Sequence, residues 1–387
     1  MKKITLLLLC SFSLYLANAQ ERVITTGVPF LMVSADARAS GMADIGIATS
    51  TDAFSQQWNP AKYAFSNHKQ GFSISYTPYL TDLVNDISLG QITYFNKINE
   101  KSTWAGSLRY FGLGNIELRN DANDQPRIVS PNELALDGSY SLKLSNTFSM
   151  AVAGRYIRSN LKVATDNTDA SAANTFAVDV AGFYQSEEKA YNHFNGIWRA
   201  GFNIQNLGPK ISYDNDEFNT NFLPANLKIG TGFDFIFDED NKLAVNLELN
   251  KLLVPTPQNP DLNGDGTVTP EEYTQNYNNY RKTGWVSGLL KSFGDAPNGF
   301  SEELKEITYA LGSEYVYKDS FAVRAGYFHE SPVKGARQYF SLGAGFKYTT
   351  AKIDVSYLFS SSKIRNPLEN TLRFSLTFNF GDNYGIN

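Results

Sequence analysis

The C-terminal part of the chain alternates between apolar and polar residues. In segment 372–380 every second residue is apolar, at Leu372, Phe374, Leu376, Phe378 and Phe380. Because successive side chains of a β-strand point to opposite faces, this segment is expected to form a strand with one apolar and one polar face. Segments 243–249 and 340–346 show the same alternation. The pattern therefore predicts a series of amphipathic strands.

Amphipathic segments of this kind follow one another from residue 70 onward. Fourteen can be assigned, at Gly71–Leu80, Ile87–Ile98, Thr103–Gly112, Glu133–Leu144, Phe148–Leu161, Thr175–Gln185, Ile197–Leu207, Leu227–Phe237, Leu243–Leu253, Ile307–Tyr317, Phe321–His329, Tyr339–Tyr348, Lys352–Ser360 and Asn370–Phe380. Each has roughly 9 to 13 residues, the length that a tilted strand needs to cross a bilayer, and closure requires an even number. The sequence thus predicts an all-β fold, a 14-stranded antiparallel transmembrane β-barrel over residues 70–381, followed by a short tail at 382–387.

The connections between these segments alternate in length. Short turns rich in turn-forming residues lie at 99–102, 145–147, 238–241, 319–320 and 349–351. Longer links lie at 113–132, 162–174, 208–226, 254–306 and 330–338, and 186–196 is longer than the alternation predicts. Outer-membrane barrels have short periplasmic turns and long external loops. With the N-terminus on the inner side, the 254–306 loop is expected at the cell surface.

Charged residues of both signs occupy the polar face of the predicted strands. They are Arg109, Asp137, Lys143, Arg155, Lys228, Asp234, Glu248, Arg324, Lys347, Asp354 and Arg373. A charge facing lipid at mid-depth would cost roughly 2 to 4 kcal/mol, so these side chains are predicted to face the lumen. The alternative fold is a soluble β-sandwich or propeller, which would require neither the even strand count nor the alternation of loop lengths.

Residues 20–69 precede the strands and do not alternate. They combine a stretch of small residues at 34–51 with apolar residues such as Phe30 and Trp58. Small residues allow close packing inside a crowded lumen, and Pro60 fixes a turn. We therefore expect an N-terminal hatch that plugs the barrel. The alternative, a disordered periplasmic tail, is disfavoured by the apolar content.

The first residues have the pattern of a secretory signal peptide. Lys2 and Lys3 precede an apolar run, and Ala17-Asn18-Ala19 is a small-x-small cleavage pattern, so residues 1–19 are expected to be removed before Gln20. The apolar run of about 13 residues is too short for a membrane anchor, which needs roughly 20. Lipid modification of Cys10 is a further alternative, which the bulky Leu9 disfavours. Cleavage would leave a chain without cysteine, and hence without disulfides or thiolate sites.

Composition adds two constraints. Aromatic residues make up 14% of the chain, with 22 Tyr and 27 Phe, and tyrosine suits the headgroup zone of a membrane. The formal net charge of −5 gives no reason to expect nucleic acid as a partner.

Segment 261–272 within the predicted long loop has the spacing of an EF-hand calcium loop. Asp261, Asn263 and Asp265 would supply side-chain oxygens at positions 1, 3 and 5, Thr267 its carbonyl at position 7, and Glu272 a bidentate carboxylate at position 12. Prolines at 255, 257 and 260 forbid the usual incoming helix, whereas Pro270 suits the start of an exiting one. We predict weak structural Ca²⁺ binding that orders residues 255–294. The alternative is a solvated acidic turn.

The predicted hatch resembles that of a known family. The run 37–44, followed by Thr51-Asp52-Ala53 and Asn59-Pro60-Ala61, is similar to the N-terminal hatch of the FadL family of outer-membrane proteins, which are 14-stranded barrels. Within that superfamily, Val28-Pro29-Phe30-Leu31 and the run 34–39 most resemble the PorV family, an outer-membrane component of the Bacteroidetes type IX secretion system. Paralogues such as PorQ remain open at this point.

The resemblance implies a non-enzymatic role in the outer membrane of a Gram-negative cell. PorV-like proteins associate with a giant translocon barrel and accept secreted cargo through its C-terminal sorting domain. They carry that cargo to a surface attachment complex with sortase activity. The matched motifs lie in the hatch, so no cargo-contact residue can be assigned from them.

Two other functional classes remain. A FadL-like transporter would pass hydrophobic small molecules, whereas an adaptor needs exposed loop surface; the long loop offers Trp285, Leu289, Leu290, Phe293 and Phe300. The three histidines, His68, His193 and His329, do not form a recognisable catalytic arrangement, so an enzyme such as a lipase is not expected.

Overall fold

The computed structural model describes residues 23–81, 83–119, 121, 125–162, 171–213, 220–362 and 366–381. The predicted signal peptide at 1–19 and the tail at 382–387 lie outside the described residues.

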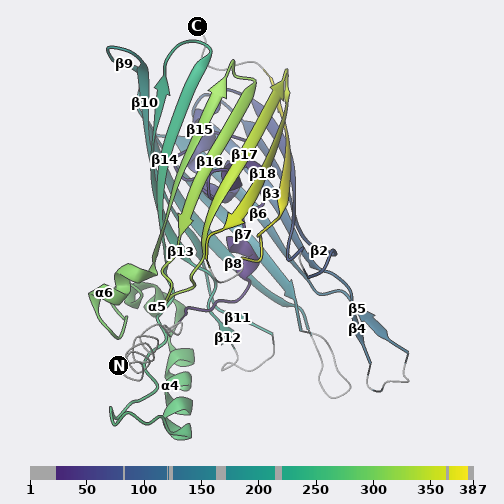
Figure 1. Cartoon of the computed structure of the whole chain (residues 1–387), viewed down its shortest axis with the longest axis vertical. Helices are drawn as coiled ribbons and strands as arrows, with labels where there is room; N and C mark the ends of the chain where they lie inside the picture. The colour runs from purple at the N-terminus through teal and green to yellow at the C-terminus, as the bar shows by residue number, and fades with distance from the viewer. Residues whose placement is uncertain are drawn as a thin grey trace, which may run out of the picture.

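Fourteen antiparallel strands form the wall of a closed barrel (Figure 1). They are β1 (Gln70–Pro78), β2 (Ile87–Lys97), β3 (Ser102–Leu113), β6 (Asn132–Lys143), β7 (Phe148–Asn160), β8 (Ala173–Gln185), β10 (Asn195–Leu207), β13 (Asn226–Ile236), β14 (Asn241–Leu252), β15 (Ile307–Tyr317), β16 (Phe321–His329), β17 (Gln338–Tyr348), β18 (Ala351–Ser360) and β19 (Leu372–Phe380). The ring closes because β19 pairs with β1 and β10 pairs with β13. The predicted barrel and its strand count are confirmed.

Side chains alternate across the wall as the sequence predicts. In β19 the apolar Phe374 is 46% exposed on the outer face, whereas the neighbouring Arg373 is 1% exposed and faces the lumen. All eleven charged residues predicted to point inward are buried or half-buried. The outer surface is therefore an apolar band, as a barrel in lipid requires.

The two ends of the barrel differ. Tight turns lie at one end, the short-turn end, and the longer links lie at the other, the long-link end (Figure 1). The exception at 186–196 belongs to the short-turn end, where β9 (Lys189–Ala190) extends the β8–β10 hairpin by pairing with β10. Phe194 in this hairpin packs on Phe235, with ring centroids 5.1 Å apart. This aromatic packing gives the longer turn a structural reason that alternation alone did not predict.

The long links carry secondary structure of their own. The β3–β6 link contains β4 (Ile116–Leu118) paired with β5 (Arg127–Val129), and the β10–β13 link contains β11 (Ile211–Ser212) paired with β12 (Thr220–Asn221). The β14–β15 link contains α4 (Pro270–Lys282), α5 (Trp285–Lys291), α6 (Phe300–Glu303) and η4 (Leu304–Glu306). None of these short elements was predicted except the helix that begins at Pro270.

The segment before β1 lies inside the barrel, where its purple ribbon is visible behind the wall strands (Figure 1). It forms η2 (Pro29–Met32), α2 (Ala37–Ser40), α3 (Ser55–Trp58) and η3 (Pro60–Phe65). Gly27 donates its N–H to Phe222 O at 2.8 Å, in the β10–β13 link, so the segment enters from the long-link end. It then runs through the lumen to β1, which begins at the short-turn end.

Among the described residues, none of the helices is long and apolar enough to span a bilayer.

Candidate functional site

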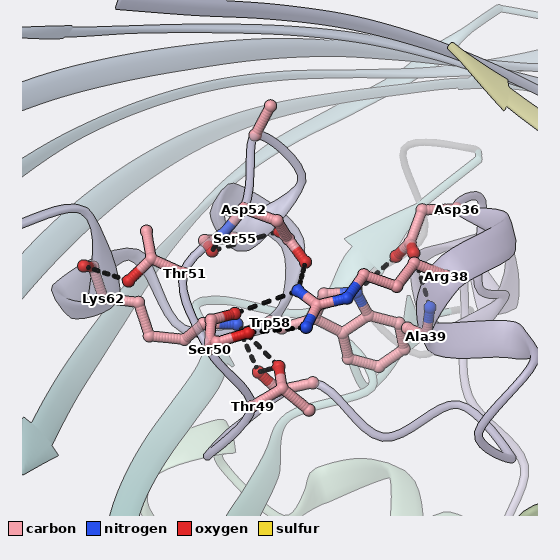
Figure 2. A network of polar contacts seen from close by, with 12 residues as sticks. Asp36, Arg38, Ala39, Thr49, Ser50, Thr51, Asp52, Ser55, Trp58 and Lys62 are labelled. Atoms are coloured by element: carbon pink, nitrogen blue, oxygen red, sulfur yellow. Dashed lines mark hydrogen bonds and ion pairs between the residues drawn. The ribbon is translucent and has the colours of Figure 1, made fainter. Parts of the chain in front are cut away.

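Arg38 is the centre of the polar network inside the hatch (Figure 2). Its guanidinium donates to both carboxylate oxygens of Glu314 on β15, at 3.0 and 2.6 Å, and to Asp52 Oδ2 at 2.6 Å. It also donates to the carbonyl of Ser50 at 3.0 Å. Two-point pairing of this kind is the strongest geometry for an arginine and a carboxylate. One buried side chain therefore joins two parts of the hatch to the barrel wall.

The network continues along the inner wall through Glu314. Arg324 on β16 donates from Nε to Glu314 Oε1 at 2.7 Å, and its Nη2 lies 2.8 Å from Asp354 Oδ1 on β18. Glu314 thus lies between two arginines, which compensates for the cost of burying its charge.

Asp36 holds the two α-helices of the hatch together. It caps α2 by accepting the N–H of Ala39 at 2.7 Å, and its other oxygen accepts the indole N–H of Trp58 at 2.6 Å (Figure 2). The indole packs against Gly46, where an added Cβ would lie 2.1 Å from the ring. Only glycine fits beside this tryptophan. The position therefore shows why small residues occur in this stretch.

Lys62 is fully buried beneath the same network. Its ammonium donates to Gly46 O and Thr49 Oγ1, each at 2.9 Å. These bonds tie η3 to the small-residue stretch, so the hatch forms one connected unit.

Further contacts fix the hatch to neighbouring strands of the same part of the wall. Asp44 accepts from Arg373 Nη1 at 3.1 Å and from the hydroxyl of Tyr339 at 2.6 Å. Glu248 on β14 accepts two hatch backbone N–H groups at 2.9 and 3.0 Å. At Gly326 an added Cβ would lie 2.4 Å from the hatch backbone at Met42, so the wall is hollowed to admit the hatch. The hatch therefore fills the lumen at mid-depth.

Apolar packing closes the lumen toward the long-link end. Buried residues of the hatch and wall form one cluster that includes Phe30, Leu31, Phe111 and Ile157. Arg109 on β3 borders this cluster and donates to the carbonyls of Phe30 and Leu31, at 3.2 and 3.0 Å. The guanidinium thus satisfies the carbonyl of Leu31 and shares that of Phe30 with the N–H of Val33.

A polar vestibule opens toward the short-turn end. It has a volume of about 530 Å³, and its floor is formed by hatch residues 50–54 and 65–68. Paired charges line its wall, among them Arg199 with Asp234 and Lys242 with Asp319. Apolar side chains such as Phe54, Phe65 and Ile236 lie among these charges, so the cavity lining is of mixed polarity.

A cluster of charges anchors the β14–β15 link to the barrel. Lys251 at the end of β14 pairs with Glu303 and Glu306 at 2.9 and 2.8 Å. Lys334, in the β16–β17 link, pairs with Glu302 and Glu306 at 2.7 and 2.9 Å. The three glutamates are all less than a tenth exposed. Sequence reasoning missed this cluster, although the run Ser301-Glu302-Glu303 before a strand was its available signal.

Acid is expected to release this anchor. Burial raises the pKa of Glu306, but hydrogen bonds from two lysines and from Thr256 outweigh burial and hold the pKa below its usual range. The folded-state pKa is thus lower than the unfolded one, so the stabilisation is complete above the ordinary value of about 4.3 and is lost as the pH falls below it.

This loss can be followed with a spin label on α5. The sequence has a single cysteine, Cys10, inside the predicted signal peptide, so Ser287→Cys gives one labelling site in the processed protein. The label should become mobile as the pH falls from 6 toward 3. In Glu306→Gln it should already be mobile at pH 7. Label mobility that does not depend on pH in the parent protein would contradict the anchoring role.

The predicted calcium loop folds back on itself. Asp261 accepts the N–H groups of Gly264 and Gly266 at 2.7 and 2.9 Å, Asn263 accepts that of Asp265 at 2.9 Å, and Asp265 accepts that of Thr267 at 2.8 Å. Gly264 and Gly266 have φ values of +74° and +83°, which glycine adopts without strain.

Glu272 faces the same loop from the first turn of α4. It forms a capping box with Thr269, and its Oε1 accepts the N–H of Asn263 at 3.3 Å. Across the described residues, no three His, Cys, Asp or Glu side chains are gathered closely enough to hold a metal ion. The donor set fits a calcium loop in type and spacing, but the carboxylates would have to turn toward a common centre. Calcium binding stays a prediction.

Exposed apolar side chains gather on α5, α6 and the adjoining residues. We call these residues the α5–α6 surface: Trp285, Val286, Leu290, Phe293, Phe300 and Leu304. Leu290 is 74% exposed and Phe300 is 75% exposed. Leu289, which was expected to be part of this surface, is half-buried instead. An exposed apolar surface of this kind is typical of an interaction site.

The three histidines lie in separate places. His68 lines the vestibule, and His193 is exposed in the extended β9–β10 hairpin. His329 ends β16 at the long-link end and stacks on Tyr309, with ring centroids 4.7 Å apart. The structure does not bring them together.

A family model described as "Type IX secretion system protein PorV" matches residues 16–259. This range covers the hatch and the wall through β14, and it ends before the calcium-loop pattern. No curated protein matches the chain.

Three solved structures with similar folds are distant from this chain in sequence. The toluene transporter TodX of Pseudomonas putida is 10% identical with a TM-score of 0.49, covering 88% of this chain and 97% of its own. The toluene transporter TbuX of Ralstonia pickettii is 9% identical with a TM-score of 0.46, covering 89% and 97%. A FadL homologue of Pseudomonas aeruginosa is 12% identical with a TM-score of 0.43, covering 93% and 99%.

The family match spans more than half of the chain and includes both the hatch and most of the wall. The chain belongs to the PorV family of type IX secretion system proteins, and it is an outer-membrane β-barrel.

Proposed function

We propose that this barrel is a non-enzymatic adaptor of the type IX system, which binds the translocon barrel and accepts secreted cargo through its C-terminal sorting domain. It then delivers that cargo to the surface attachment complex. The family match is the observation that carries the proposal. In this proposal the long-link end faces the cell surface.

The filled lumen supports an adaptor over a transporter. Arg38, Asp44 and Glu248 each join the hatch to the wall or to another part of the hatch through buried polar contacts. Opening a path for a ligand would require several of these buried contacts to break together, and each buried charge would then lack a partner. The vestibule mixes apolar side chains with paired charges, and a hydrocarbon bound there would bury those charges further.

The α5–α6 surface supports a protein partner at the long-link end. Its side chains are largely exposed, and the charge cluster around Glu306 holds this part of the link on the barrel rim. A surface held in a fixed position loses less conformational entropy on binding, so it favours association.

Native co-purification from envelope membranes tests the adaptor directly. We expect a very large barrel and secreted cargo to be recovered with the chain. Recovery of bound fatty acid or hydrocarbon without any protein partner would instead indicate a transporter, and would overturn the proposal.

We also propose that Ca²⁺ orders the loop at 261–272, with Asp261, Asn263, Asp265, Thr267 and Glu272 as its ligands. A dissociation constant of about 0.1 to 1 mM is expected for such an extracellular site. Ca²⁺ should slow proteolysis of the loop in the parent protein relative to a chelator.

Glu272→Gln is the variant best suited to this test. It keeps an oxygen for the capping box with Thr269 but removes the bidentate carboxylate, so the protection by Ca²⁺ should disappear. Glu271→Gln, one residue earlier, is the matched control and should keep that protection. If proteolysis of the parent protein is the same with Ca²⁺ and with chelator, the loop is an ordinary acidic turn.

A further inference from the structure

The inner wall at the vestibule contains two lysines that face each other. Lys347 on β17 and Lys352 on β18 are direct cross-strand partners, and both line the vestibule. Like charges placed opposite each other destabilise a sheet. Other cations of the vestibule have a carboxylate of their own, as Arg199 has Asp234 and Lys242 has Asp319. Among the described residues the two facing lysines have one carboxylate contact between them, that of Lys352 with Asp354.

Acidic side chains do not fully compensate for these lysines. Lys352 Nζ lies 3.4 Å from Asp354 Oδ2, and Asp354 also faces Arg324. Within the described residues, no carboxylate lies within ion-pair distance of Lys347. A third basic side chain, His68, also lines the vestibule, and burial together with the charge of Lys347 lowers its pKa.

Arg324 adds a donor without an acceptor at the same corner. It is 1% exposed, and while its Nη2 lies 2.8 Å from Asp354 Oδ1, its Nη1 has no hydrogen-bond partner among the described residues. Unsatisfied buried donors are rare in folded proteins because each has a cost in free energy. Gly345 lies beside this guanidinium, and a Cβ added there would come within 2.5 Å of Asp354 Oδ1, 2.9 Å of Nη2 and 3.1 Å of Nη1. The glycine thus leaves room for this ion pair and for the unpartnered Nη1.

A neutral donor completes the corner. Thr377 on β19 is the cross-strand partner of Lys352 and also lines the vestibule. Four neighbouring strands, β16 to β19, therefore present two ammonium groups, a guanidinium and a hydroxyl to one side of the cavity. The compensating carboxylates are Asp354, Glu314 and Asp52, of which the last two are shared with Arg38.

We infer that this corner of the vestibule, formed by Arg324, Lys347, Lys352 and Thr377, binds an oxyanion, either a phosphate or a carboxylate. The hatch forms the floor of the vestibule, so the ligand enters from the short-turn end. A space of about 530 Å³ accommodates a small anion or the end of an extended peptide, but not a folded domain. The inference does not depend on the proposed adaptor role.

Titration of the purified full-length protein in detergent tests the inference. One probe is inorganic phosphate, against chloride at matched ionic strength. The other is a short acetylated dipeptide with a free C-terminal carboxylate, against its amidated form. We expect saturable binding of at least one oxyanion by calorimetry, and none of the amidated peptide. Binding of phosphate alone identifies a free-phosphate site, and binding of the carboxylate alone identifies a peptide-terminus site.

Substitution of the two lysines locates the site. In Lys347→Gln/Lys352→Gln the dissociation constant should rise at least tenfold, which corresponds to about 1.4 kcal/mol. Lys318→Gln is the matched control, because Lys318 lies in an exposed turn at the same end and outside the vestibule lining. It should bind like the parent protein.

A second measurement separates binding from folding. Without added anion, Lys347→Gln should raise the thermal unfolding midpoint, because it removes a like-charge contact. With saturating oxyanion, this advantage over the parent protein should shrink or reverse. The inference is overturned if the parent protein shows no saturable binding at about 10 mM ligand, or if the double variant binds as tightly as the parent.

Discussion

Arg38→Met is expected to lower the free energy of unfolding by about 3 to 5 kcal/mol, the range found when one partner of a buried ion pair is removed. The methionine keeps most of the side-chain volume, so the loss reflects charge and hydrogen bonding. Asp52 would lose its ion-pair partner, and Glu314 would keep only its bond to Arg324. The midpoint of urea unfolding in detergent micelles measures the effect.

Two variants show whether the loss comes from the buried network. Arg119→Met removes an exposed pair, in which Arg119 and Glu117 are 3.4 Å apart and their side chains are 46% and 60% exposed, and it should cost less than about 1 kcal/mol. The double variant Arg38→Met/Glu314→Gln should recover part of the lost unfolding free energy. Glutamine is neutral, so no uncompensated negative charge stays buried at position 314. Equal shifts for Arg38→Met and Arg119→Met would show that the hatch does not depend on this contact.

Leu290→Asp and Phe300→Asp are each expected to reduce recovery of the translocon barrel and cargo by more than tenfold. These two side chains are the most exposed of the α5–α6 surface. Burial of such an apolar anchor in an interface contributes about 2 kcal/mol or more, and a charge at that position adds a desolvation cost. Quantitative co-purification from envelope membranes measures the effect.

Ile128→Asp is the matched control for this surface. Ile128 is 62% exposed on β5, in a different link at the same end of the barrel. The same apolar-to-charged change should leave recovery unchanged there. If all three variants retain their partners, the interface lies elsewhere on the barrel, and the adaptor role would then need another surface.

The wall strands were predictable because each of their two faces lies in one uniform environment. Each residue of β19 or β14 faces either lipid or lumen, so polarity alternates with the strand period and the pattern can be read without any partner. The one irregular turn, at 186–196, was visible as an exception. Its cause, the packing of Phe194 on Phe235, involves a contact between separate strands and has no local signal.

The candidate sites were less predictable. The calcium-loop pattern is local, since all five proposed ligands lie within twelve residues. Leu289 was expected on the apolar surface, but the helix turns it partly inward, which depends on how α5 packs. The anchor around Glu306 was missed because its lysines, Lys251 and Lys334, come from distant links.

Alternation, loop lengths and the hatch motif by themselves determined that this chain is a closed barrel with an internal plug, because each of these signals lies within a short stretch of sequence. Only the tertiary structure decided which charges meet in the lumen. Arg38 and Glu314 are 276 residues apart in the chain and 2.6 Å apart in space. Insertion of the hatch into the lumen brings them together, and the pairing of β16, β17 and β18 places Arg324, Lys347 and Lys352 on one side of the same cavity.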